Sequence, residues 1–265
     1  MNIRIQDVIH ALAAQIGEIP NSVDRLIAGN PLSEVKGIVV AFMATRRVLE
    51  QARIWGANLV VTHEGVFYSH RETGETCSDH ESVHADKKRF IEDSGIAIYR
   101  LHDSLHRASP DGIMEGLIQA LDWQEHKIEH FPAASVVHLP ASTVGVVAEH
   151  VKQRLGLATL RLAGDLAMPC RRVGLLVGYR GGIEHSVPLF EKHNVDLVAY
   201  GEGPEWETPE YVRDAIEIGR RQALLVLGHL ESEQPGMRLL ADRLGVLFPS
   251  VPVRFCPVES VFKAV

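Results

Sequence analysis

Residues 59–65 (LVVTHEG) place an imidazole and a carboxylate directly after a short apolar run. The run 59–61 is rich in β-branched residues and has the length of a buried strand. Imidazole nitrogen and carboxylate oxygen together suit a divalent ion such as zinc, manganese or iron. His63 and Glu64 are therefore a candidate metal-binding pair at the end of a strand.

Similar polar residues follow three other apolar runs. In open α/β sheets, ligands bind beyond the carboxyl ends of the strands, so we expect these side chains to gather at such edges. A single histidine or glutamate at a strand end is commonly a hydrogen-bonded surface residue, so the set carries more weight than any member. The further candidates are His102 and His106, Glu202, and His229 and Glu233.

The segments that carry these residues alternate between strand and helix patterns. Residues 37–44 predict a buried strand, 45–56 predict a helix that ends at Gly56, and 58–62 predict a second strand. A strand–helix–strand unit favours parallel strands joined by a right-handed crossover. A further strand is expected over 95–101 and a further helix over 111–121. The fold class is therefore α/β.

The second half of the sequence repeats the first. Residues 172–203 show the same strand, helix and strand as residues 37–65, which aligns Glu202 with Glu64. The alternative explanation is that any two strand–helix–strand units look alike. We predict two similar α/β lobes, residues 1–125 and 126–265, with the boundary in the stretch 123–135.

Composition excludes several classes of protein. The 265 residues are 46% hydrophobic, which allows a sizeable core, and the formal net charge of -7 argues against a general nucleic-acid binder. Three widely spaced cysteines suggest no disulfide framework. No apolar stretch has the length of a signal peptide or a membrane span, so we expect a cytoplasmic protein without membrane contact.

Two other segments have competing interpretations. Cys77, His80 and His84 have spacing that suits part of a zinc site, but Ser78 and Glu81 resemble the capping box of a helix, which is the interpretation that we favour.

Gly178, Gly181 and Gly182 precede a predicted helix whose N-terminus could hold a phosphate, with Arg180 beside it. Their spacing matches neither a P-loop nor a dinucleotide-binding fingerprint.

Three motifs resemble the NIF-three-like family of dinuclear metal-centre proteins, often labelled GTP cyclohydrolase I type 2 homologues. NLVVTHEG resembles a family segment that ends in two histidines and a proline, and YRLHDSLHRASPDGIMEGL resembles one with a His followed four residues later by an Asp. LGHLESEQPG resembles the closing Gly-His motif with its following Glu, which is the most specific match. The resemblance covers nearly the whole chain. It implies two α/β lobes with a metal cleft between them and a toroidal homohexamer.

The resemblance also implies a set of metal ligands, of which two depart from the family pattern. Glu64 stands where the family has a second histidine, and His106 stands where it has an aspartate. The exchange preserves three histidines and two carboxylates, but His106 cannot bridge two ions as an aspartate does, so we expect one or two divalent ions. His102 is expected to orient a ligand or carry a proton, and Glu202 is the candidate general base. The implied ligands are His63, Glu64, His106, His229 and Glu233.

Two functions follow from these expectations. The first is a metal-dependent, hydrolase-like activity on a nucleotide or another small molecule, in which the metal activates water. The second is a non-catalytic metal-binding scaffold whose oligomer binds partners. An open coordination position on the metal would distinguish an active site from a structural one.

Overall fold

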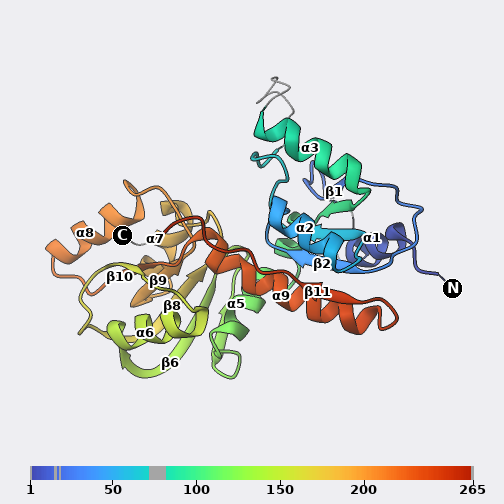
Figure 1. Cartoon of the computed structure of the whole chain (residues 1–265). Helices are drawn as coiled ribbons and strands as arrows, with labels where there is room; N and C mark the ends of the chain where they lie inside the picture. Colours follow the sequence, from blue (N-terminus) through green and yellow to red (C-terminus); the bar gives the residue numbers. More distant parts are fainter. Residues whose placement is uncertain (1, 15–16, 18, 72–81, 264–265) are drawn as a thin grey trace. The chain divides into compact units, whose positions relative to one another are not determined.

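The computed structural model describes residues 2–14, 17, 19–71 and 82–263. The chain divides into two compact units (Figure 1). Unit 1 comprises Met1–Gly112 and Met237–Glu259, and unit 2 comprises Ile113–Gly236 and Ser260–Val265. The division into lobes at residues 125 and 126 that we expect from the sequence stays a prediction.

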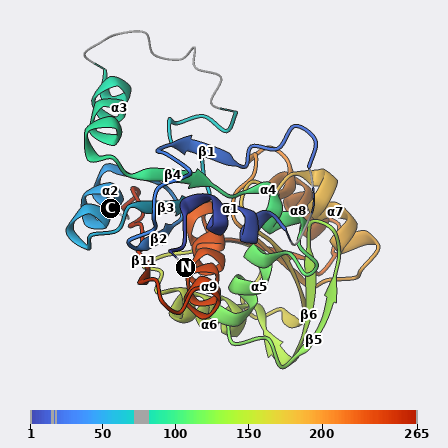
Figure 2. The ribbon, with the colours of Figure 1, turned by 90° about the vertical axis from the view of Figure 1, so that its right-hand side faces the viewer.

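Unit 1 is built on a sheet in the strand order β1-β4-β3-β2-β11, which can be followed in Figure 2. Strands β11, β2, β3 and β4 are mutually parallel, and β1 pairs with β4 in the antiparallel sense. Every residue of β2, β3 and β4 is buried, as expected for a parallel sheet covered on both faces. The strands are β1 (Arg25–Ala28), β2 (Ile38–Ala41), β3 (Leu59–Thr62), β4 (Ala97–Arg100) and β11 (Val253–Phe255).

The helices of unit 1 form where the sequence provides caps and an apolar stripe. Thr45 caps the helix after β2, because its hydroxyl accepts a hydrogen bond from the Val48 amide at 3.2 Å. The buried face of that helix, with Leu49, packs on Val39 and Val60 of the sheet. The helices are α1 (Ile5–Ala13), α2 (Arg46–Ile54), α3 (Val83–Ser94) and α4 (Asp103–Arg107).

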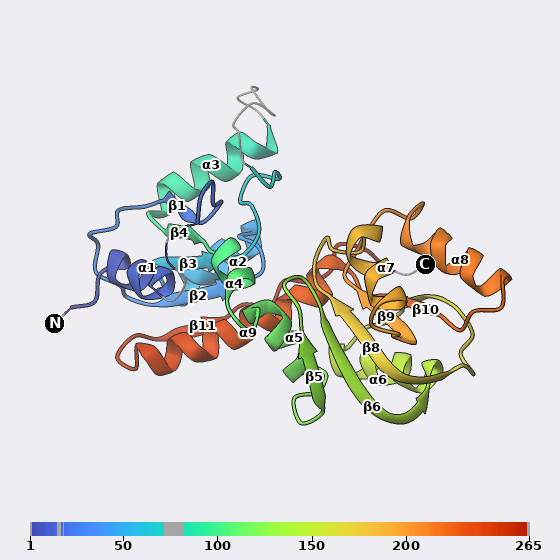
Figure 3. The same cartoon turned by 180° about the vertical axis from the view of Figure 1, so that it is seen from behind.

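Unit 2 contains the sheet β5-β6-β8-β9-β10-β7, whose antiparallel strands β5, β6 and β8 are seen in Figure 3. Strands β8, β9 and β10 are parallel, and β7 pairs with β10 in the antiparallel sense. Helix α9 (His229–Leu247) begins in unit 2 and ends in unit 1. The other elements are β5 (Lys127–His130), β6 (Ser135–Thr143), β7 (Arg161–Ala163), β8 (Pro169–Leu176), β9 (Leu197–Tyr200), β10 (Ala223–Val226), α5 (Gly112–Ala120), α6 (Val144–Leu155), α7 (Ile183–Glu191) and α8 (Thr208–Glu217).

The α/β class and the internal repeat predicted from the sequence are confirmed. The segment β2-α2-β3 recurs as β8-α7-β9, and a third parallel strand follows in each unit, β4 in unit 1 and β10 in unit 2. Within the described residues, no helix combines the length and the apolar character needed to cross a membrane.

Candidate metal centre

Two of the predicted ligands stand directly after β3 in unit 1. The backbone amides of His63 and Glu64 both donate to the carbonyl oxygen of Phe42, at 3.1 and 2.9 Å. These bonds tie the residues after β3 to the end of β2, so the two side chains leave the sheet from a fixed backbone. The His63 side chain is fully buried, which makes this position rigid.

His106 lies in the short helix α4 after β4, and His102 is the N-cap of that helix. The Leu101 amide donates to the Thr62 carbonyl at 2.8 Å, which extends the β3–β4 pairing up to His102. The Asp24 carboxylate then accepts the amides of His102, Asp103 and Ser104 at 2.6, 2.8 and 2.8 Å. A carboxylate at the start of a helix satisfies amides that the helix leaves without partners. Asp24 therefore fixes the point from which both histidines extend.

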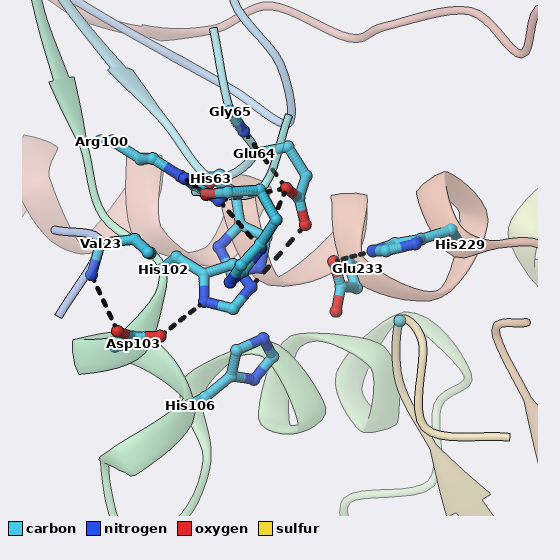
Figure 4. Close-up of polar contacts among 12 residues, drawn as sticks. Val23, His63, Glu64, Gly65, Arg100, His102, Asp103, His106, His229 and Glu233 are labelled. Atoms are coloured by element: carbon cyan, nitrogen blue, oxygen red, sulfur yellow. Dashed lines mark hydrogen bonds and ion pairs between the residues drawn. The ribbon is translucent and has the colours of Figure 1, made fainter. Parts of the chain in front are cut away.

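The hydrogen bonds of the three rings assign the nitrogen that carries a hydrogen, and Figure 4 shows the one between His102 and Asp103. Nδ1 of His63 lies 3.1 Å from the carbonyl oxygen of Leu101, and Nδ1 of His102 lies 2.9 Å from Oδ1 of Asp103. Nδ1 of His106 lies 3.0 Å from Oδ2 of Asp111. Carbonyl and carboxylate oxygens only accept, so each Nδ1 carries a hydrogen, and Nε2 is the nitrogen that has the lone pair in the neutral form of each ring. Histidines that bind metals are commonly oriented in this way.

The same three rings lie close together. Ring centroids are 4.5 Å apart for His63 and His102, 5.0 Å for His63 and His106, and 4.8 Å for His102 and His106. One donor atom from each of the three lies within 4.8 Å of the others. Burial, and after it the neighbouring rings of His63 and His106, lower the pKa of His102 to about 4. The His102 ring is therefore neutral at pH 7, the form that binds metals.

Glu64 lies between this group and a buried arginine that sequence reasoning missed. Arg100 is 1% exposed, and it donates through Nη2 to Oε2 of Glu64 at 3.3 Å and to Nδ1 of His70 at 3.2 Å. It also donates to the backbone carbonyls of His63 and His70. The other carboxylate oxygen of Glu64, Oε1, lies 3.7 Å from Nε2 of His102. A second group of neighbouring donors is formed by Glu64, His70 and His102.

In unit 2 a second cluster forms at the ends of β9 and β10. Nδ1 of His229 lies 2.9 Å from Oε1 of Glu202, and Nε2 lies 3.0 Å from Oε2 of Glu233. His229 and Glu233 begin helix α9, one turn apart. Gly178 makes room for them, because a Cβ at that position would overlap Oε1 of Glu233.

Each unit thus brings its predicted residues together. His63, Glu64, His102 and His106 gather in unit 1, and Glu202, His229 and Glu233 gather in unit 2. Their assignment as ligands or catalytic groups stays a prediction. Imidazole nitrogens and carboxylate oxygens are the donor types that divalent ions of the zinc, manganese or iron class take in proteins.

The other two sequence segments have different outcomes. Cys77, His80 and the expected capping box lie outside the described residues, whereas His84 lies in α3 with its ring centroid 4.6 Å from that of Phe67. The helix expected after the glycine-rich stretch 178–182 is α7, and Gly182 is its N-cap.

Comparisons with known proteins agree with the resemblance. A family model described as Duf34/NIF3 (NGG1p interacting factor 3) matches residues 23–260. A relative from Clostridium perfringens, described as a GTP cyclohydrolase 1 type 2 homolog, is 24% identical over 227 residues, covering 83% of this chain and 81% of the relative.

Solved structures show the same fold. The crystal structure of a Bacillus cereus protein related to NIF3 matches with a TM-score of 0.79 and 14% identity, covering 100% of this chain and 99% of that one. Reduced HcgD from Methanocaldococcus jannaschii matches with a TM-score of 0.70 and 16% identity, covering 98% of this chain and 99% of that one. At these identities the likeness shows the fold alone.

Proposed function

The chain belongs to the Duf34/NIF3 family, and from that premise we propose that it binds divalent metal and uses it to activate water for hydrolysis of a small molecule. The observation that carries the proposal is the group of three imidazoles in unit 1 whose donor atoms lie within 4.8 Å of one another. The residues proposed to serve metal binding are His63, Glu64 and His106 in unit 1, and His229 and Glu233 in unit 2.

The chemistry of these donors supports the proposal. Nδ1 of His63 and of His106 each faces an oxygen acceptor, which leaves Nε2 of both rings as the atom proposed to coordinate. The ring of His229 lies between two carboxylates, those of Glu202 and Glu233. When bound, a divalent ion lowers the pKa of its water toward neutrality and supplies a nucleophile at physiological pH.

The chain's own residues would hold this arrangement and handle protons. The carboxylate of Glu202 accepts a hydrogen bond from Nδ1 of His229, so Glu202 would fix the orientation of that ring. The side chain of Glu202 is also 47% exposed, so substrate and solvent can reach the carboxylate. This exposure is compatible with the general-base role expected from the sequence.

A nucleotide is the first substrate class to test, because a relative is described as a GTP cyclohydrolase 1 type 2 homolog. Purified protein, stripped with a chelator, would be reloaded with zinc, manganese or iron and incubated with a panel of nucleotides. We expect release of phosphate or of a ring-opened product with at least one metal, and a loss of turnover in His63→Ala. Bound metal without turnover on any substrate would favour the scaffold function.

The homohexamer implied by the resemblance also remains a proposal. Light scattering coupled to size exclusion gives the molar mass directly. A mass equal to six chains is expected, and a monomer at micromolar concentration would contradict it.

A further inference from the structure

We infer that unit 2 binds the planar ring of a nitrogen heterocycle, and that the side chains of Tyr179 and Trp206 are the surfaces on which this ring stacks. The inference rests on the proposed function in that it takes the cluster of Glu202, His229 and Glu233 as part of the substrate site. It goes beyond that function because it names the part of the substrate that is recognised and two residues that recognise it.

Both aromatic residues lie in loops at the carboxyl ends of parallel strands. Tyr179 is in the loop between β8 and α7, and Trp206 is in the loop between β9 and α8. Ligands of open α/β sheets bind beyond this edge of the sheet, and His229 follows β10 at the same edge. The two aromatic residues therefore belong to the same edge as Glu202, which stands in the loop of Trp206.

The loop of Tyr179 is fixed to Glu202 by two backbone hydrogen bonds. The amide of Glu202 donates to the carbonyl oxygen of Gly178, and the amide of Gly181 donates to the carbonyl oxygen of Glu202, both at 2.9 Å. The fully buried hydroxyl of Thr208 also donates to the carbonyl oxygen of Gly181, at 2.7 Å. Tyr179 lies between the two bonded glycines, so its backbone is preorganised and a ligand pays little to order it.

The loop of Trp206 is tied to the same backbone. Oε2 of Glu207 accepts a hydrogen bond from the amide of Ile183, the first residue of α7, at 3.1 Å. A Cβ on Gly203 would come within 2.6 Å of the carbonyl carbon of Gly181, so the backbones of the two loops are in contact. Trp206 stands between Gly203 and Glu207 and is therefore held on the same frame as the other aromatic residue.

Both rings are exposed although each has a large apolar surface. The side chain of Tyr179 is 64% exposed and that of Trp206 is 77% exposed. Within the described residues, neither side chain takes part in a hydrogen bond, an ion pair or a contact between aromatic rings. Tyrosine and tryptophan dominate the energetics of cores and interfaces because of the area that they bury. The faces of these two rings are thus open to a ligand.

The charges in these loops favour a ring with N–H donors over a phosphate group. The side chain of Glu202 is bonded only to His229, through Oε1, among the described residues, which leaves Oε2 to accept N–H groups. The neighbouring cation, Arg180, donates through Nη1 to the carbonyl oxygen of Ala133 at 3.4 Å. Stacking on aromatic side chains, combined with hydrogen bonds to the edge of the base, is how enzymes recognise a single nucleobase.

The test measures the binding of guanosine, which has the ring but no phosphate, to the full chain as purified. The chain has three tryptophans, of which Trp123 is buried, Trp55 is half-buried and Trp206 is exposed. Stacking on Trp206 should quench the protein fluorescence, with saturation below about 1 mM, the upper end of ordinary substrate affinities. Inorganic phosphate, which lacks the ring, should neither quench the fluorescence nor compete with guanosine.

Substitutions separate the roles of the two rings, with affinities measured by calorimetry. Tyr179→Ala should weaken guanosine binding by roughly 5- to 150-fold, the range that one stacked base provides, whereas Tyr179→Phe keeps the ring and should stay within about threefold of the wild type. Trp206→Phe should still bind guanosine but lose the quenching.

Leu166→Ala is the matched control. Leu166 is an apolar residue that is 58% exposed in the loop before β8, at the opposite edge of the same sheet. Its replacement should leave the affinity for guanosine unchanged.

The inference is overturned if guanosine neither quenches the fluorescence nor binds, or if Tyr179→Ala binds it as tightly as the wild type. A Tyr179→Ala variant with unchanged guanosine affinity and a lower molar mass in light scattering would show that this ring is a contact between chains. In each case, bound metal and turnover of another small molecule would leave the proposed function in place. Guanosine binding by a chain that holds no divalent ion would remove the proposed function and support the inference.

Discussion

Units 1 and 2 use one strand plan for two different sets of chemical groups. In both, three consecutive parallel strands are followed on one side by an antiparallel strand that precedes them in the sequence: β1 beside β4, and β7 beside β10. These two edge strands, each with the glycine that follows it, also have similar sequences: RLIAG at 25–29 and RLAG at 161–164. The scaffold is therefore repeated in detail.

The strand ends differ. The last residue of β4 is the buried Arg100, whereas the last residue of β10 is Val226. After the middle strand, unit 1 has His63 and Glu64, and unit 2 has Gly201 and Glu202. Sheet packing constrains the interiors of the strands, while the residues just beyond them are able to diverge. Unit 1 has a cluster of histidine rings and the buried Arg100, whereas unit 2 has His229 between Glu202 and Glu233.

Replacing the buried Arg100 should have the largest effect on the free energy of unfolding. Arg100→Leu leaves the Glu64 carboxylate largely buried without its partner, which costs about 3–5 kcal/mol of unfolding free energy. Urea unfolding of the metal-free protein measures this. The double variant Arg100→Leu with Glu64→Gln should recover much of the loss, because no charge is then stranded. A single variant as stable as the wild type would show that the pair is not coupled.

Acid should destabilise unit 1 next. The pKa of His102 is lowered from 6.5 to about 4 in the folded metal-free chain. Between these values the unfolded chain binds more protons, so stability is fully present above pH 6.5 and falls as the pH drops toward 4, by on the order of 3 kcal/mol. Unfolding measured from pH 7.5 to 4.5 should show a flatter profile in His102→Asn. Identical pH profiles of stability for the wild type and His102→Asn would contradict the assignment of a lowered pKa to His102.

The shared edge-strand glycines give a smaller effect. Gly29 and Gly164 have φ of +94° and +130°, and a Cβ on either would press on the alanine that opens the third strand, Ala97 or Ala223. We expect Gly29→Ala and Gly164→Ala each to cost about 1–3 kcal/mol. Gly56→Ala is the control, since its Cβ would meet nothing within 4 Å and only the positive φ opposes it. Thermal melts that rank the control as the most damaged would refute the packing argument.

The smallest effect is expected at the carboxylate that holds His229. Glu202→Gln should weaken metal binding in unit 2 by about tenfold, because a neutral amide holds the ring less firmly than a carboxylate. Glu205→Gln, at an exposed site in the same loop, should leave the metal affinity of unit 2 unchanged. Turnover lost at full metal affinity would instead support the general-base role of Glu202.

Much of the fold could be predicted from the sequence. The apolar runs 37–44, 58–62 and 95–101 predicted β2, β3 and β4, because buried parallel strands require continuous apolar residues. The candidate site residues at the strand ends could also be predicted from the sequence, because few polar residues follow such apolar runs.

Other features depend on contacts that spacing does not encode. Asp24 caps α4 from 78 residues away along the chain. The role of Asp111 follows from its bond to His106, which only the folded chain brings about. Of these features, Arg100 could have been found from the sequence. It is a charged residue at the end of an otherwise apolar strand, and a buried charge needs a buried partner.

The central claim is that strand-end histidines of unit 1 bind a divalent ion. The most direct measurement is elemental analysis of chelator-stripped protein after equilibrium dialysis against zinc, for the wild type and for His63→Ala. We predict at least one tightly held ion per wild-type chain and the loss of one ion in the variant. Equal metal content in the two proteins, or none in either, would contradict the account.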